Sequence, residues 1–368
     1  METKPDQKDP LEGLRFRVAL DTTTICNLRC KQCFHTLYHT RALPYRQHEM
    51  PPALFEKILD ELDEQIDSLV LSCSAEPFTN SDFGRYLAAL RRRQAPYEKW
   101  LATNLLLLKE SLARDLIETG LTWMVVSIDG ARPETYKALR VGGDFDRLLD
   151  RLDLVNRLKA EMGAERPFLR FNVILSRLNL EDLPRFVELA AEKRVAEVTF
   201  QHLVPFEGLG LKRQTLHYES RRKVAAIFEA TRERARQLGV ALGELNDLKS
   251  PLQSFGDFLA DLARRWRKPP ASLPLLERIF CYHVWLNLVV NSRGDLFPCF
   301  CWINDAPMGN VGRQTFREIW ESAPYRQLRD ELLGERPLRA HCLDCSRRGR
   351  KLLSRSSFRE QEITLHEL

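Results

Sequence analysis

Three closely spaced cysteines, Cys26, Cys30 and Cys33, are the residues of this 368-residue chain best suited to chemistry. Thiolates are the usual ligands of iron-sulfur clusters, and such a cluster takes four ligands. Three cysteines at C-x3-C-x2-C spacing would leave one iron open to a ligand from outside the protein. The spacing therefore indicates a cluster that binds a further molecule. A zinc site completed by His35 or His39 is the alternative.

A second group of cysteines lies in the C-terminal part of the chain. A predicted β-hairpin, which turns at Gly294, would bring Cys281 close to Cys299. Glycine readily adopts the positive φ that such a tight turn needs. Cys342 and Cys345 form a CxxC pair, which can hold one metal from a single turn. Together these four thiolates are enough for a closed site, either a structural zinc or an iron-sulfur cluster.

The composition describes a globular protein with metal or redox chemistry. Hydrophobic residues make up 44% of the chain, and the net charge of +5 is small against 56 basic and 51 acidic residues, so we expect no nucleic-acid partner. No apolar run approaches the roughly 20 residues of a membrane span. Residues 1–15 are polar and lack the apolar centre of a signal peptide. We expect a cytoplasmic location, where the nine cysteines would stay reduced.

Hydrophobic periodicity predicts alternating strands and helices. Strands are predicted at residues 16–20, 68–72, 99–102, 123–128, 168–175 and 197–203, with a C-terminal strand at 284–290; helices are predicted at 50–66, 82–93, 111–119, 145–160, 180–192 and 219–238. Strands separated by helices of this length imply βαβ units and a parallel sheet. Periodicity alone does not distinguish an open sheet from a partial barrel. In both, ligands gather at the carboxyl ends of the strands.

The cysteine triplet and the motifs at these strand ends resemble the radical S-adenosylmethionine (SAM) superfamily. The resemblance implies an α/β fold, a partial (β/α)6 TIM barrel, with a [4Fe-4S] cluster on the triplet whose open iron binds SAM. Cleavage of SAM then releases a 5′-deoxyadenosyl radical that abstracts hydrogen from a substrate. It also implies an external one-electron donor such as flavodoxin or ferredoxin. One residue departs from the family: Gln32 stands where an aromatic side chain commonly packs against the adenine.

The residues after the second and third strands resemble two further family segments. Ser74-Ala75-Glu76-Pro77 is similar to the family's Gly-Gly-Glu-Pro, which implies that Glu76 meets the SAM amino group. Thr103-Asn104 resembles the family's Thr-Asn-Gly without its glycine.

Four further residues are implied to bind SAM. The resemblance places Ser127, at the end of the fourth strand, on the ribose and Arg140 near the carboxylate. The planar fork of arginine suits a carboxylate because it donates two parallel hydrogen bonds. Asn172 and Ser176, on and after the fifth strand, are additional ribose candidates.

Candidates for the substrate side of the site are two cysteines and two residues of the sixth strand. Cys73 and Cys301 are left over from the predicted ligand sets, and either could donate a hydrogen atom to a substrate radical as a catalytic residue. The alternative is a buried cysteine that acts as a small hydrophobic residue. Gln201 and His202 could face the substrate.

The C-terminal region resembles the SPASM/twitch domain of many radical SAM enzymes. The pattern Cys-x12-Gly-x4-Cys, followed by a terminal CxxC, implies an auxiliary [4Fe-4S] cluster on Cys281, Cys299, Cys342 and Cys345, with Cys301 as a substitute for Cys299. The larger SPASM form has two extra clusters and needs later cysteines. No cysteine follows Cys345 in this sequence, so we expect the small α+β twitch form with one auxiliary cluster.

The expected organisation therefore has two domains. The predicted segments are an N-terminal tail (1–15), the radical SAM core (16–238), a connecting segment (239–280), the SPASM/twitch domain (281–350) and a C-terminal tail (351–368).

The resemblance favours an oxidoreductase. We expect oxidation of a small polar or sugar-like substrate, with the auxiliary cluster as electron acceptor. Modification or epimerisation of a ribosomal peptide by the same radical chemistry is an alternative. A non-catalytic zinc-binding protein is an alternative from another class. A lipid-modifying role is suggested only by the basic segment around Trp266.

Overall fold

The computed structural model divides the chain into two compact units, which we describe separately. The barrel unit contains Leu20–Pro52 and Leu69–Leu248, and the C-terminal unit contains Met1–Ala19, Ala53–Ser68 and Lys249–Leu368. The structure describes residues 11, 13–39, 47–72, 74–205, 208–243, 245, 281, 283–299, 306–333 and 342. Cys73, Cys301 and Cys345 lie outside these residues.

Strands β1 to β7 follow one another in the sheet order β1-β2-β3-β4-β5-β6-β7. Their bounds are β1 Phe16–Leu20, β2 Ile66–Leu71, β3 Glu98–Thr103, β4 Trp123–Ser127, β5 Phe168–Leu175, β6 Glu197–His202 and β7 Ala241–Leu242. Strands β3 to β7 are parallel. The six predicted strands are confirmed, and the fold is that of the radical SAM partial barrel. The sequence prediction missed β7, because two residues carry no periodicity.

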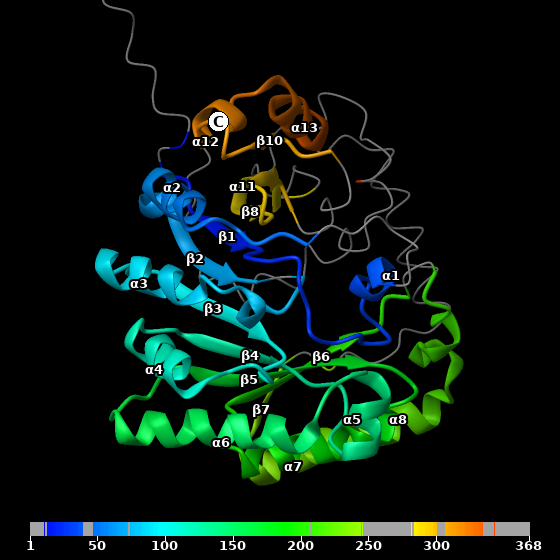
Figure 1. Ribbon diagram of the computed structural model, residues 1–368. Helices are drawn as coiled ribbons and strands as arrows, with labels where there is room; N and C mark the ends of the chain where they lie inside the picture. The colour runs from blue at the N-terminus through cyan, green and yellow to red at the C-terminus, as the bar shows by residue number, and fades with distance from the viewer. Residues whose placement is uncertain are drawn as a thin grey trace, which may run out of the picture. The chain divides into compact units, whose positions relative to one another are not determined.

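Helices follow the strands of the barrel unit along the chain (Figure 1). Their bounds are α1 His35–His39, α3 Phe83–Arg93, α4 Glu110–Glu118, α5 Pro133–Leu139, α6 Phe145–Glu161, α7 Leu183–Glu192 and α8 Arg221–Leu238. Helix α4 contacts α3 and α6, and α7 packs along α8. Helices α3 to α8 therefore pack mostly against helices near them in sequence, whereas the short α1 follows the cysteine loop.

The two faces of the sheet differ in burial. On β5, Leu169, Phe171 and Val173 are completely or almost completely buried, as expected for the face that packs against amphipathic helices. The residues between them, such as Arg170 and Asn172, are half-buried on the opposite face. Side chains alternate between the two faces of a strand. The half-buried face therefore presents polar groups to the concave side of the partial barrel.

The C-terminal unit contains an antiparallel hairpin, as expected. Strand β8 (Asn287–Val290) pairs with β9 (Asp295–Phe297), which pairs with β10 (Gly309–Asn310). Gly294 has the expected positive φ of 86° in the turn. The predicted strand at 284–290 is wrong in its first half, where α11 (His283–Leu286) forms a helical turn. A short apolar run does not distinguish strand from buried helix.

Helix α2 (Pro52–Leu62) belongs mostly to the C-terminal unit, together with α12 (Phe316–Trp320) and α13 (Ala323–Leu333). The helix predicted at 50–66 ends earlier than expected, because Ile66 begins β2. The Glu61 carboxylate accepts the Phe316 N–H at 2.6 Å, so α2 is attached to the start of α12. Within the described residues, we find no helix with the length and apolar character needed to cross a bilayer.

Candidate active site

The loop between β1 and α1 carries Cys26, Cys30 and Cys33 as free thiols. Burial raises the pKa of all three, that of Cys30 to about 12, whereas the positive charge of Arg140 acts in the opposite direction. The backbone N–H of Leu28 donates to Cys26 Sγ at 3.5 Å. Metal ligands must be thiolates, so loading this loop releases protons.

The donor set fits an iron-sulfur cluster better than a zinc ion. Zinc needs ligands that converge on one point at about 2.0–2.3 Å, and in the described part of the chain no three His, Cys, Asp or Glu side chains form such a group. The thiolates of a [4Fe-4S] cube bind different irons and need not converge. His35, a predicted fourth zinc ligand, has its Nε2 2.8 Å from the Thr24 carbonyl oxygen. The side chain of His39 lies outside the described residues.

The cysteine loop is attached to the segment that follows α5. The Arg29 N–H donates to the Val141 carbonyl at 2.9 Å, and the Lys31 N–H donates to the Leu139 carbonyl at 3.0 Å. Gly142 follows with a φ of 89°, which a glycine adopts without strain. These two bonds hold the cysteines beside Arg140.

Glu76 lies where the segments after β2 and β3 meet. Its carboxylate accepts hydrogen bonds from the Thr103 hydroxyl and the Asn104 N–H, both at 2.7 Å, and from the Phe78 N–H at 3.3 Å. Burial raises the pKa of Glu76 to about 7, although the three donors act against this rise. The structure thus brings Glu76, predicted to bind SAM, together with the Thr103-Asn104 segment that resembles a family motif.

Leu105 occupies the position of the glycine that the family's Thr-Asn-Gly segment has. Its φ is 70°, in the left-handed region, and its side chain is completely buried. Its N–H donates to the Thr103 hydroxyl oxygen at 2.8 Å. The chain therefore keeps the glycine-like backbone at this position and uses the side chain for packing.

Arg140 forms an ion pair with Asp129, with 2.5 Å between Arg140 Nε and Asp129 Oδ2. Burial alone would lower the pKa of Arg140, but the negative charges of Asp129 and Cys30 raise it above its usual range. Asp129 Oδ1 accepts the Ile174 N–H from β5 at 2.8 Å. No described residue accepts a hydrogen bond from the two terminal nitrogens of Arg140. The ion pair with Asp129 thus lies on the Nε side of the guanidinium, and the two terminal nitrogens are available to a ligand.

Sequence reasoning missed Asp129. The available signal was an acidic residue two positions after Ser127, just beyond a buried strand at the edge where ligands gather. A carboxylate there needs a partner, but the sequence offers both Arg132 and Arg140, and only the fold shows that Arg132 pairs with Asp182 and Arg140 with Asp129.

The other predicted SAM residues divide into two groups. Ser127 pairs in register with Asn172, and both are half-buried on the concave face of the sheet. The Asn172 side-chain oxygen accepts the Thr199 hydroxyl at 3.3 Å. Ser176 is buried, and its hydroxyl donates to Asn179 at 3.2 Å. The structure therefore brings Ser127 and Asn172 together but gives Ser176 a partner within its own loop.

Three exposed apolar side chains lie in the segments after α5, β5 and β6. Val141, Leu178 and Val204, which we call the rim residues, are 41%, 46% and 56% exposed. Gln201 and His202, at the end of β6, are also exposed. His202 is therefore not a core histidine.

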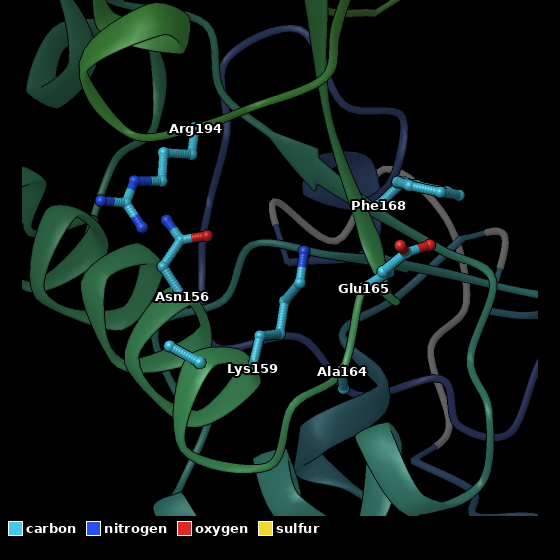
Figure 2. A pocket seen from close by; sticks show the side chains of 7 residues that line it. Asn156, Lys159, Ala164, Glu165, Phe168 and Arg194 are labelled. Carbon is cyan, nitrogen blue, oxygen red and sulfur yellow. The ribbon is translucent and has the colours of Figure 1, made fainter.

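A cavity of about 370 Å³ lies elsewhere in the barrel unit. Figure 2 shows Lys159 and Asn156 of α6 around it, with Phe168 and Arg194. Phe168 is the first residue of β5, so this cavity is near the amino ends of the strands. Ligands of such folds bind at the opposite ends.

The C-terminal unit carries three of the four predicted auxiliary ligands within the described residues. Cys281, Cys299 and Cys342 are half-buried. Cys281 precedes α11, and Cys299 follows β9, so these two cysteines flank the hairpin segment as predicted. The negative charge of a Cys299 thiolate contributes to the raised pKa of Tyr325, after burial, which is the main cause. Cys299 therefore lies near α13.

Two family models match the chain. The Radical SAM superfamily matches residues 20–190, and the SPASM iron-sulfur cluster-binding domain matches residues 281–346. These ranges contain the two cysteine groups described above.

Known proteins with similar sequence or structure agree. The chain is 27% identical to an AdoMet-dependent heme synthase of Methanosarcina barkeri over 326 residues, 86% of each chain. It is 25% identical to a PqqA peptide cyclase of Xanthomonas oryzae pv. oryzae over 309 residues, 83% of this chain and 74% of the relative. The crystal structure of Streptococcus suis SuiB bound to S-adenosylmethionine superimposes with a TM-score of 0.65 at 16% identity, covering 92% of this chain and 72% of SuiB.

The matches do not support the alternative of a non-catalytic zinc protein. The chain belongs to the radical SAM superfamily and is a radical SAM enzyme with a C-terminal SPASM iron-sulfur domain.

Proposed function

We propose that this enzyme oxidises its substrate by abstracting a hydrogen atom and then removing one more electron and a proton. When bound, the cluster and SAM supply the 5′-deoxyadenosyl radical, and an auxiliary cluster supplies an electron acceptor. The observation that carries the SAM-cleaving part of the proposal is the buried Arg140–Asp129 pair beside the three free thiols. The pair places the positively charged Arg140 guanidinium next to the cysteine loop.

The protein's own groups would orient SAM in three ways. Arg140 would bind the carboxylate through its terminal nitrogens, since Asp129 already holds Nε. Glu76 would accept hydrogen bonds from the amino group, and ionisation of this buried carboxyl strengthens that contact. Ser127 and Asn172 would contact the ribose, whereas Ser176 would first have to release Asn179.

The C-terminal unit would hold one auxiliary [4Fe-4S] cluster through Cys281, Cys299, Cys342 and Cys345, with Cys301 as the substitute for Cys299. The positions of Cys281 before α11 and Cys299 after β9, on both sides of the hairpin, support this assignment. An external one-electron donor such as flavodoxin or ferredoxin would reduce the SAM cluster. Cys73 and Cys301 remain proposed hydrogen-atom donors.

The rim residues favour a second candidate, modification of a peptide. A small sugar would need a polar site, whereas Val141, Leu178 and Val204 are exposed apolar side chains in the segments after α5, β5 and β6. The similar PqqA peptide cyclase has a peptide in its name, and the similar heme synthase is named for a macrocycle. An oxidised substrate with apolar parts is consistent with both relatives.

Anaerobic reconstitution tests the proposal. Wild-type protein should contain about eight iron and eight sulfide, as two [4Fe-4S] clusters require, and should form 5′-deoxyadenosine from SAM and dithionite. Cys30→Ala should abolish this product. Cys342→Ala should remove about half of the iron and keep SAM cleavage, but should stop substrate oxidation.

A deuterated substrate completes the test. Deuterium transferred into 5′-deoxyadenosine, in amounts equal to the oxidised product, supports the proposal. Return of deuterium to an isomerised product would replace oxidation by a redox-neutral reaction. Bound zinc and the absence of SAM cleavage would refute the proposal.

A further inference from the structure

Gln32 contacts the same carboxylate oxygen that holds Arg140. Its side-chain Nε2 donates a hydrogen bond to Asp129 Oδ2, the atom that also pairs with Arg140 Nε. Gln32 lies between Cys30 and Cys33, at the position where the family commonly has an aromatic side chain. One oxygen atom therefore joins the cysteine loop to the segment after α5.

Asp129 has little freedom to move. Its side chain is 1% exposed, its Oδ1 accepts the Ile174 N–H at 2.8 Å, and its carbonyl oxygen accepts the Asn179 side-chain amide at 2.9 Å. Because β5 binds Oδ1 of this buried carboxylate, the direction of Oδ2 is also fixed. Gln32 and Arg140 both bind that second oxygen.

The backbone bonds of the loop do not fix the guanidinium. Arg29 and Lys31 bind the carbonyls of Val141 and Leu139, on either side of Arg140, and these bonds place its backbone but not its side chain. The direction of the guanidinium depends on Asp129. Arg140 Nε forms an ion pair with Asp129 Oδ2 but no hydrogen bond, so without Gln32 this oxygen would lose its hydrogen-bond donor, and the carboxylate could turn about its remaining contacts.

The acceptor atom of Gln32 is also informative. Gln32 Oε1 is buried and has no hydrogen-bond partner in the described part of the chain. Gln32 is thus held by its donor group alone, and the contact with Asp129 determines its orientation.

We propose that Gln32 is a positioning residue: its amide fixes Asp129 and thereby directs the Arg140 guanidinium, which sets the affinity for SAM and the reduction potential of the neighbouring cluster. The charge of Arg140 acts on all three cysteines. The inference rests on the proposed contact of Arg140 with the SAM carboxylate.

Three variants of Gln32 separate a hydrogen bond from packing. Gln32→Leu removes the donor, and Gln32→Phe introduces the aromatic class typical of the family. Both should weaken SAM binding about tenfold, which corresponds to about 1.4 kcal/mol, at unchanged iron and sulfide content. Gln32→Glu places a second carboxylate against Asp129, and the added negative charge should make the potential of the SAM-free cluster more negative. Gln237→Leu, which removes an exposed amide–carboxylate contact on α8, is the matched control.

A double variant provides the rescue. Gln32→Glu combined with Asp129→Asn keeps one carboxylate and one amide at the contact with their positions exchanged. It should bind SAM more tightly than Gln32→Glu alone, and such non-additivity is the mark of a direct contact.

Titration of SAM into the reconstituted proteins, with electron paramagnetic resonance of the reduced cluster, decides the matter. A Gln32→Leu variant with wild-type affinity and potential would overturn the inference, as would a Gln32→Phe variant that binds SAM more tightly than wild type. In either case, a wild-type protein that cleaves SAM would still satisfy the proposed function. A wild-type protein that does not cleave SAM would refute the proposed function, whatever Gln32 does.

Discussion

Two arginine–carboxylate pairs in the barrel unit have the same separation and different surroundings. Arg140–Asp129 and Arg170–Glu197 both measure 2.5 Å. The first lies beyond the carboxyl ends of the strands beside the cysteine loop. The second lies near the amino ends, since Arg170 is the third residue of β5 and Glu197 the first of β6.

Their remaining contacts differ more than their lengths. The Arg170 guanidinium lies over the rings of Trp100 and Trp123, 4.7 and 4.2 Å from the centroids, so aromatic faces occupy it. Arg140 has no aromatic contact among the described residues, and its terminal nitrogens have no described acceptor. An arginine–carboxylate ion pair alone does not indicate a functional site. The terminal nitrogens of Arg140 do, because they remain available to bind a ligand.

Breaking the first pair should have the largest effect. Arg140→Met leaves the buried Asp129 charge without its cation, and loss of one partner of a buried pair costs about 3–5 kcal/mol. We expect no detectable 5′-deoxyadenosine, measured by chromatography after anaerobic reconstitution. Arg140→Lys, which keeps the charge and loses the fork, should retain a small fraction of the product. Equal activity of the Arg140→Lys variant and the wild-type enzyme would contradict the role of the fork.

Breaking the second pair should affect stability and not SAM. Arg170→Met removes an ion pair and two cation–π contacts, so we expect the free energy of unfolding to fall by about 1–3 kcal/mol in urea titrations. The 5′-deoxyadenosine yield per bound cluster should stay within about twofold of wild type. A complete loss of cleavage in a folded, cluster-loaded variant would show that this pair also acts at the site.

The pH dependence of Glu76 adds a smaller effect. Its pKa is raised to about 7, so the folded protein binds a proton that the unfolded chain has already released between about pH 4.5 and 7. Stability of the unloaded protein should therefore decrease as pH rises through this range, and Glu76→Gln should remove this contribution. SAM affinity should increase over the same range if the carboxylate receives the amino group. Urea titrations and SAM titrations at several pH values measure both.

The smallest expected change comes from Thr103→Val. The substitution keeps the shape of the side chain and removes the hydroxyl that donates to Glu76 at 2.7 Å. The pKa of Glu76 should rise further, since one group that lowers it is lost. SAM affinity near pH 7 should fall by a few-fold, within the range of about 0.5–1.5 kcal/mol that one typical hydrogen bond contributes. An unchanged pH profile would place the SAM amino group elsewhere.

Most of the fold could be predicted because apolar periodicity marks the long elements. The limits appear where local pattern and tertiary context disagree. Residues 284–286 have the composition of a strand and form a helical turn, and β7 is too short to carry a pattern. Leu105 adopts a glycine-like φ that its residue type does not suggest.

The candidate site was predictable in its residue types but not in its partners. The thiols, Glu76 and Arg140 follow from the motif, whereas Asp129 required the fold. The contact of Gln32 with Asp129 joins two loops far apart in sequence. The sequence identified Gln32 as unusual for the family. Its hydrogen-bond partner, the Asp129 carboxylate, could be identified only from the fold.

SAM binding to reconstituted Arg140→Lys and Arg170→Lys proteins, measured side by side with wild type, tests the central claim most directly. Both variants keep a positive charge and lose a planar fork. We predict that Arg140→Lys weakens SAM binding by at least about tenfold, or about 1.4 kcal/mol, and that Arg170→Lys binds SAM as wild type does. Equal affinities of the two variants for SAM would contradict the assignment of Arg140 to the SAM carboxylate.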